Sequence, residues 1–228
     1  AGMTVASSRA PSFSDDLGML IFGIVETEMT EEAKRRDERG EQEESDETEA
    51  EGAEGPGRQG RGGNADEPDK PELVIWHWKD DRLQSAQQVQ ETRDRNANHL
   101  AVYHISEGRF VRIADDDLPN VSMAPGQEWA VGRDISRYEL MGNLNGQRFT
   151  DLWVIDVNTG DRTMALERAR WLNAVSPDGT HLLYYDNGDY HTYEFASGTH
   201  YNITEDVDTS FINTEDDHNI VDPPVRSI

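Results

Sequence analysis

Alternating apolar and polar residues mark several short stretches in the second half of the chain. In three places such a stretch runs eight positions from an apolar residue to a glycine: Leu100 to Gly108, Leu152 to Gly160 and Tyr190 to Gly198. Alternation is the period of a β-strand, and glycine supplies the positive φ that a tight hairpin turn needs. We therefore predict a β-hairpin at each of these places.

A second kind of turn recurs in register with the hairpins. A proline turn follows 17 residues after the first two glycines, at Pro125 and at Pro177, and proline presets φ for a turn. The stretch SFSDDLGMLIFGI near the start has the same form, with Asp15 and Asp16 at its turn. The repeating unit is therefore strand, glycine turn, strand, linker, strand, proline turn, strand.

Four antiparallel strands in about 40–45 residues are typical of one blade of a β-propeller. The turn glycines are 38 residues apart between Gly160 and Gly198 but 52 apart between Gly108 and Gly160. We expect the additional residues, SRYELMGNLNGQRF, to form a loop between strands. Residues 152–157 place apolar side chains on both faces of their strand, so this sheet should lie between other sheets.

The sequence thus predicts an all-β fold, a partial β-propeller of roughly three four-stranded antiparallel blades with one long disordered insertion. A β-sandwich is the alternative, but sandwiches do not repeat their turns in register. The predicted segments are the start of a first blade (1–25), the insertion (26–70), the remainder of that blade with a polar helix or arm (71–118), a second blade (119–170), a third blade (171–204) and the start of a further blade (205–228).

Residues 26–70 combine charge, glycine and proline without periodicity, which is the composition of a disordered insertion. Within this segment, GRQGRGG resembles an RNA-binding tract. Acidic runs flank it, however, so we interpret it as part of a flexible loop.

Composition restricts the possible partners. The formal charge is -25, which argues against nucleic acid and anionic membrane surfaces as main partners. The longest apolar run, Leu17 to Val25, has nine residues, whereas a membrane span needs about 20. There is no cysteine, so the redox compartment cannot be inferred. The start at Ala1 has the form of a cut end, which leaves an upstream signal peptide open; a periplasmic or secreted location is only weakly favoured.

Longer stretches carry a family resemblance. AVSPDGTHLLYYDNGDYHTYEF resembles the Ser-Pro-Asp-Gly blades of prolyl oligopeptidase-like serine peptidases and of periplasmic Tol-type propellers. Three longer stretches are similar to the N-terminal half of large bacterial members of the peptidase family. They are the stretch from LVIWHWKDDRL to LPNVS, the stretch RYELMGNLNGQRFTDLWVIDVNTG and the stretch SFINTEDDHNIVDPPVRSI. The resemblance covers the chain from about Pro11 to Ile228, apart from the insertion.

The resemblance implies a propeller that gates peptide access to a C-terminal α/β-hydrolase domain. The nucleophile of such a domain lies in G-x-S-x-G, a motif that this chain lacks; Ser176 and Ser197 have no glycines at those positions. The glutamate pair that binds the substrate amine in dipeptidyl peptidases has no counterpart outside the insertion, where Glu31-Glu32 and Glu43-Glu44 lie. We therefore predict a non-catalytic segment whose partners are its own hydrolase domain and peptide substrates. The alternative is a non-enzymatic Tol-type propeller that binds proteins or ligands.

Other polar clusters do not identify a site. His99 and His104 should point to opposite faces of one strand, and three further histidines lie on separate strands: His181, His191 and His200. The acidic runs 114–117 and 214–219 lack the ligand spacing of a cation loop. Most of the tryptophans should pack between blades rather than line a ligand surface: Trp76, Trp78, Trp129, Trp153 and Trp171. RLQSAQQVQETRDR predicts a short amphipathic helix, with Leu83, Ala86 and Val89 on one stripe, or an extended arm. No catalytic, cofactor-binding or metal-binding residue is predicted.

Overall fold

The computed structural model describes residues 2–27, 77, 80 and 82–213. Several sequence predictions lie outside these residues: almost all of the insertion with its glutamate pairs, Trp76 and Trp78, the acidic run 214–219 and the C-terminal residues 214–228. The chain divides into two compact units, of which one comprises residues 3–25 and 81–228. Nearly all of the described strands and helices belong to that unit.

The first sheet is built around a long strand near the N-terminus. Its order is β1-β3-β4-β5, and β2 also pairs with β3. The strands are β1 (Gly2–Val5), β2 (Ser12–Phe13), β3 (Met19–Thr27), β4 (His99–His104) and β5 (Arg109–Arg112). The pairs β2–β3, β3–β4 and β4–β5 are antiparallel.

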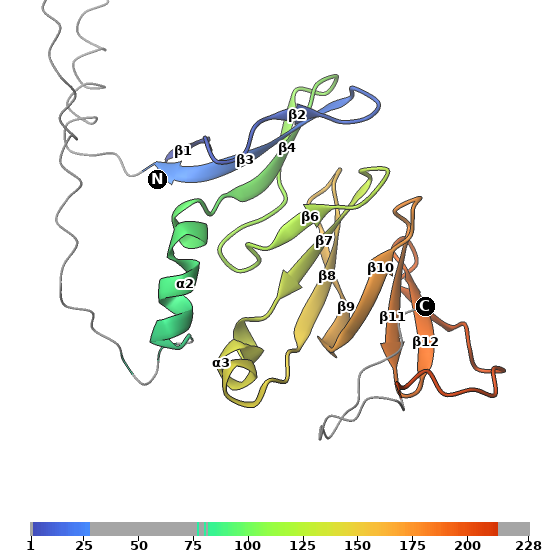
Figure 1. Cartoon of the computed structure of the whole chain (residues 1–228). Helices are drawn as coiled ribbons and strands as arrows, with labels where there is room; N and C mark the ends of the chain where they lie inside the picture. The colour runs from blue at the N-terminus through green and yellow to red at the C-terminus, as the bar shows by residue number, and fades with distance from the viewer. Residues whose placement is uncertain (1, 28–76, 78–79, 81, 214–228) are drawn as a thin grey trace, which may run out of the picture. The chain divides into compact units, whose positions relative to one another are not determined.

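Two further sheets follow along the chain, each with four strands in simple antiparallel order (Figure 1). The second sheet contains β6 (Val121–Met123), β7 (Trp129–Asp134), β8 (Thr150–Asp156) and β9 (Arg162–Ala169). The third contains β10 (Trp171–Val175), β11 (His181–Asp186), β12 (Asp189–Glu194) and β13 (Thr199–Asn202). The prediction of a mostly β chain with antiparallel sheets is confirmed.

The same turn joins the first two strands of each repeat. An N–H at its start donates to a carbonyl five residues later: Ser14 to Met19 (2.9 Å), Ala124 to Trp129 (2.9 Å) and Ser176 to His181 (2.8 Å). The fourth residue of each turn has positive φ: Leu17 (61°), Gln127 (60°) and Gly179 (71°). The predicted hairpin glycines also have positive φ: Gly108 (63°), Gly160 (81°) and Gly198 (68°).

Two apolar cores lie between successive sheets. Val102 and Val111 of the first sheet share one core with Ile155 of the second. Leu152 and Val154, also in the second sheet, share the other core with residues of the third, such as Tyr193. Because Ile155 and Leu152 are both fully buried, the prediction that β8 is apolar on both faces is confirmed. The partly buried Trp129 and Trp153 pack against these cores.

Two helices interrupt the β pattern. The helix α2 (Gln84–Arg95) forms where a helix or arm was predicted, but none of its residues is buried and Val89 of the apolar stripe is 84% exposed. The helix α3 (Ser136–Asn145) corrects the prediction of a loop. The side chain of Asp134 accepts a hydrogen bond from the Ser136 N–H (2.9 Å), and Gly146 ends the helix with φ 75°. Neither helix is long and apolar enough for a membrane span; that holds for the described residues alone.

Candidate functional site

The two ends of the second and third sheets differ. One end carries the short turns after β6, β8, β10 and β12, whereas the other carries α3 between β7 and β8 and the crossing from β9 to β10. Binding residues are found more often on such connecting segments than inside strands, because a rigid sheet positions them. The second end therefore carries the segments that are best placed to form a site.

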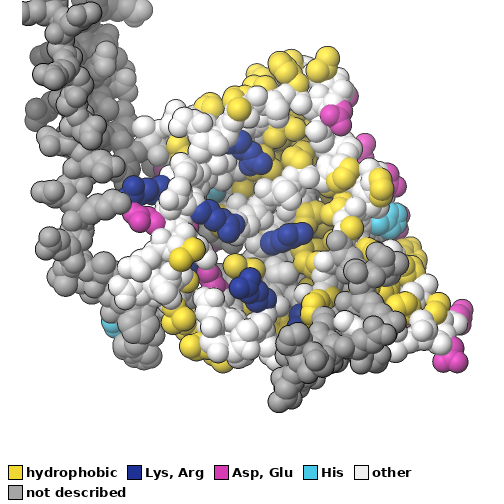
Figure 2. All heavy atoms as spheres, in the orientation of Figure 1, with side chains coloured by type: hydrophobic (Ala, Val, Ile, Leu, Met, Phe, Trp, Pro, Cys, Tyr) yellow, Lys and Arg dark blue, Asp and Glu magenta, His cyan; other side chains and the backbone are white. Residues whose placement is uncertain are grey.

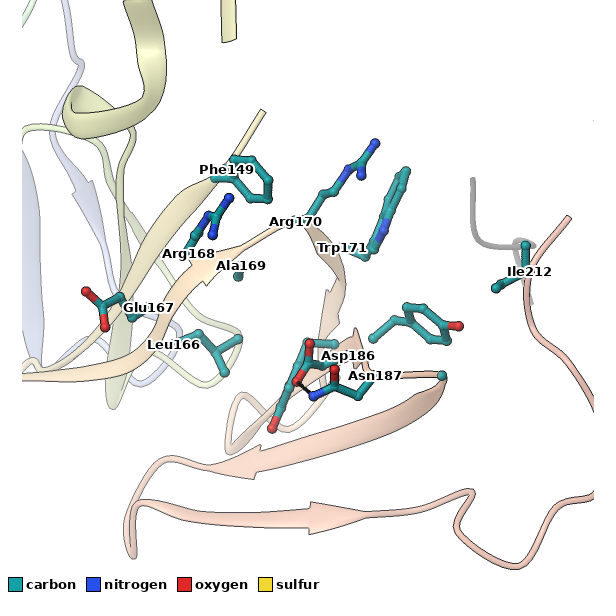
Figure 3. A pocket seen from close by; sticks show the side chains of 13 residues that line it. Phe149, Leu166, Glu167, Arg168, Ala169, Arg170, Trp171, Asp186, Asn187 and Ile212 are labelled. Atoms are coloured by element: carbon teal, nitrogen blue, oxygen red, sulfur yellow. Dashed lines mark hydrogen bonds between the residues drawn. The ribbon is translucent and has the colours of Figure 1, made fainter. Parts of the chain in front are cut away.

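A cavity of about 560 Å³ lies at this end. Its lining comes from the start of β8, the β9–β10 crossing and the β11–β12 turn, and includes Phe149, Leu166, Arg168, Arg170, Trp171, Tyr185 and Asp186 (Figure 3). A volume of this size suits a small organic molecule, and a mostly apolar lining with a few polar groups is typical of such pockets. We refer to it as the crossing pocket.

Arg168 occupies an unusual backbone position in the crossing pocket. Its φ is 54°, in the left-handed region that residues with a Cβ seldom adopt. The β8–β9 pairing shifts register in two places there, between Thr150 and Leu152 and between Leu152 and Trp153. A bulge of this kind redirects a side chain, and strained backbone of this kind gathers at functional sites.

A buried carboxylate holds this backbone conformation. Asp151 is 2% exposed and accepts hydrogen bonds from the Arg168 N–H (2.7 Å), the Tyr138 hydroxyl (2.7 Å) and the Arg137 guanidinium (3.2 Å). Burial raises the pKa of the Asp151 carboxyl, but these hydrogen bonds outweigh burial and hold its pKa below the ordinary value. Asp151 is therefore an ionised anchor that joins α3 to the bulge.

Aromatic rings orient both arginines of the pocket. The Arg168 guanidinium lies 4.5 Å from the centre of the Phe149 ring, and the Arg170 guanidinium lies 4.9 Å from that of Trp171. Stacking fixes the guanidinium plane, and in Arg168 it leaves the in-plane N–H donors able to bind a planar anion. Within the part of the chain that the structure describes, the Arg168 guanidinium has no carboxylate partner.

Neither of the two carboxylates of the pocket lining pairs with Arg168 among the described residues. Glu167 pairs with Arg137 (3.3 Å), and Figure 3 shows its carboxylate directed away from Arg168 and Arg170. Asp186 accepts a hydrogen bond from the Asn187 side chain (2.8 Å). The arrangement can therefore bind an anion beside an aromatic surface.

A second cavity of about 660 Å³ lies beside α2. One face of the described unit has arginine side chains in its middle, with most carboxylates nearer the edges (Figure 2). The lining of the second cavity mixes both signs: Arg9, Arg82, Arg93, Arg133, Asp94, Asp116, Asp117, Asp134 and Glu139. Arg82, for example, already pairs with Asp94 (2.9 Å) and Glu139 (3.2 Å). We therefore favour the crossing pocket as the site.

The histidines that the sequence singled out do not line the crossing pocket, although His191 and His200 contact Tyr184, which does. At the two ends of β4, His99 pairs with Asp116 (3.1 Å) and the buried His104 lies against the Val157 carbonyl (3.3 Å). His191 stacks on Tyr184 at 5.2 Å, and His200 hydrogen-bonds the Tyr184 hydroxyl (2.8 Å). In the described ranges, no three His, Asp or Glu side chains converge as a metal site would require.

The run 114–117 forms a turn. The Asp115 carboxylate accepts from the Leu118 N–H (3.0 Å) and pairs with Arg162 (2.9 Å). Through its ion pair with Arg162 of β9, the Asp115 carboxylate connects the segment before the second sheet to that sheet.

Ser176 and His181 stand in a proline turn but not in a catalytic arrangement. The Ser176 hydroxyl donates to Asp178, whereas the His181 ring contacts the Thr180 hydroxyl (2.7 Å). Hydrogen bonds from Ser176 and Thr180 lower the pKa of Asp178 to about 2. The cluster stabilises the turn. Ser197 likewise donates to Glu194 (2.7 Å) within its own hairpin.

Comparisons with known proteins do not identify a family. No protein-family model and no curated protein sequence matches this chain.

Proposed function

We propose that this chain is a non-catalytic propeller segment of a prolyl oligopeptidase-like serine peptidase, and that it gates peptide access to a hydrolase domain outside residues 1–228. One observation carries the proposal: the same turn, with the same hydrogen bond and positive φ, recurs at Ser14, Ala124 and Ser176 in three successive sheets. Sheets that repeat in register and share cores with their neighbours are what a propeller requires.

Gating follows from the physical nature of such a ring. A ring of rigid sheets leaves a channel of fixed width, which short extended peptides can enter and folded proteins cannot. The sequence resemblance supplies the peptidase part of the proposal, because it covers the chain from about Pro11 to Ile228.

The test uses the complete gene product that contains these residues. It should react with a fluorophosphonate probe at one serine outside residues 1–228, and it should cleave short peptides much faster than a folded protein of matching sequence. Absence of labelling, or labelling of a serine within residues 1–228, would contradict the proposal.

The alternative is a Tol-type propeller that binds a protein or ligand without catalysis. The crossing pocket favours it, because this pocket can hold a ligand without any nucleophile. A complete protein that binds ligand at this pocket but resists the fluorophosphonate probe would decide for this alternative.

A further inference from the structure

We infer that the crossing pocket recognises a carboxylate attached to an apolar or aromatic body, such as the free C-terminus of a short peptide. The choice of peptides rests on the proposed function. The recognition of a carboxylate rests only on the pocket, so the two can fail separately.

Charge and geometry indicate an anion. The Arg168 and Arg170 side chains both line the pocket, one residue apart in sequence, in a protein whose formal charge is -25. The lining also contains the carboxylates of Glu167 and Asp186, but neither pairs with Arg168 among the described residues, so the Arg168 guanidinium can accept an anionic partner. The planar fork of a guanidinium matches a carboxylate through two parallel N–H···O bonds.

The position of Arg168 is held independently of any ligand. Asp151 binds the Arg168 N–H at 2.7 Å, and Phe149 stacks on the guanidinium at 4.5 Å. A side chain fixed at both its backbone and its charged end loses little freedom when a ligand binds, which favours affinity.

The size and lining of the pocket indicate the rest of the ligand. A cavity of about 560 Å³ is much larger than a carboxylate or an inorganic anion. One part of its remaining walls is apolar or aromatic and includes Leu166, Trp171, Tyr185 and Ile212, whereas another part is polar and includes Glu167, Asp186 and Asn187. A peptide of two or three residues with one carboxylate would fit both the arginine side of the pocket and its apolar side.

The experiment measures binding to the purified chain of residues 1–228 by isothermal titration calorimetry. The ligands are 3-phenylpropionate, N-acetyl-alanyl-phenylalanine with a free carboxylate, its C-terminal amide, and N-acetyl-glutamyl-phenylalanine amide. The last ligand carries its carboxylate on a side chain, so it shows whether the pocket distinguishes a side-chain carboxylate from a C-terminal one. Both free acids should bind, the C-terminal amide at least about tenfold more weakly, because a charge-assisted pair is lost.

Three variants locate the site. Arg168→Gln and Arg170→Gln should each weaken binding of the free acids by about tenfold or more. Arg133→Gln removes the same charge from the other cavity and should leave affinity within about twofold, because the contact is local. Should Arg168→Gln not fold, Arg168→Lys tests the same point, since it keeps the charge but loses the planar fork.

Several results would overturn the inference. They are equal binding of the acid and its amide, unchanged affinity in a folded Arg168 variant, an equal loss in Arg133→Gln, or no binding of either acid at millimolar concentration. Binding of 3-phenylpropionate without either peptide would uphold the carboxylate site and overturn its assignment to peptides.

Discussion

Asp151 connects three parts of the chain through one buried carboxylate. It accepts hydrogen bonds from Arg137 and Tyr138 of α3 and from the backbone of Arg168. A buried group of this kind is costly when a partner is lost, because the remaining polar atoms cannot reach water. The conformation of the crossing pocket should therefore depend on this residue.

Asp151→Asn should lower the free energy of unfolding by about 1–3 kcal/mol. The amide oxygen can still accept from the Tyr138 hydroxyl and the Arg168 N–H, which share Oδ1 of the carboxylate. The amide NH2 then faces the Arg137 guanidinium, so a charge-assisted hydrogen bond is lost. Urea denaturation followed by circular dichroism measures the effect. Asp161→Asn, a change at an exposed position, is the matched control and should be close to neutral. An equal effect of the two substitutions would contradict the role of Asp151.

The pKa of Asp151 also predicts a pH dependence. Because its pKa is lowered in the folded state, its contribution to stability is fully present above the ordinary aspartate value of about 4 and is lost as the pH falls through the folded pKa. The stability difference between the wild-type chain and Asp151→Asn should therefore shrink below about pH 4. A difference that stays constant from pH 7 to well below pH 4 would contradict the prediction.

At the scale of single elements, the sequence predicted what depends on local pattern. Alternation and turn glycines located β4, β8 and β12, because these signals come from neighbouring residues. The helix α3 was missed although Ser136 and Glu139 have the spacing of a capping box and Gly146 follows as a stop signal. The stretch is instead predicted as a loop, because it accounts for the additional residues between Gly108 and Gly160.

The crossing pocket was not predicted either. Phe149, Arg168 and Tyr185 come from separate strands or connections, and their meeting depends on the bulge at β9 and the packing of two sheets. The spacing of these residues in the sequence does not predict that their side chains lie close together. The one local signal is the succession Arg168, Arg170 and Trp171, in which cations stand next to an aromatic ring.

Contact between the turns of successive sheets gives a prediction for Gly179. A Cβ at Gly179 would stand 1.7 Å from the Pro125 carbonyl oxygen, whereas one at Gly146 would meet nothing within 4 Å. The two glycines have similar φ, 71° and 75°, so both alanine variants share the backbone cost of about 1–2 kcal/mol.

Gly179→Ala should therefore destabilise the protein more than Gly146→Ala, by about a further 1–3 kcal/mol from the forced shift of the turns. Thermal and chemical denaturation of both variants measure this difference. Equal destabilisation would show that the turn of the third sheet does not pack on that of the second.

At the scale of the whole molecule, residues 1–228 should hydrolyse nothing by themselves. G-x-S-x-G does not occur in the chain, and the hydroxyls of Ser176 and Ser197 donate to acidic side chains rather than to a histidine ring. Without a histidine base, a serine hydroxyl is a weak nucleophile. Chromogenic peptides containing proline or alanine, together with a fluorophosphonate probe, check this. Turnover above background or stoichiometric labelling would contradict it.

The central claim is that the three sheets are successive blades of one ring, and an unburied face of the first sheet tests it. Three residues hold equivalent positions in the three sheets: Tyr103, Ile155 and Tyr193. In each case the backbone N–H two residues later donates a hydrogen bond to a carbonyl of a neighbouring turn. Ile155 is 0% and Tyr193 2% exposed, but Tyr103 is 38% exposed and its strand partner Phe110 50%.

The most direct measurement is an experimental structure of the complete gene product. A ring predicts that Tyr103 and Phe110 are buried there as fully as Ile155 and Tyr193, against another antiparallel sheet. Tyr103 and Phe110 still exposed to solvent, or covered by something other than a sheet, would contradict the claim.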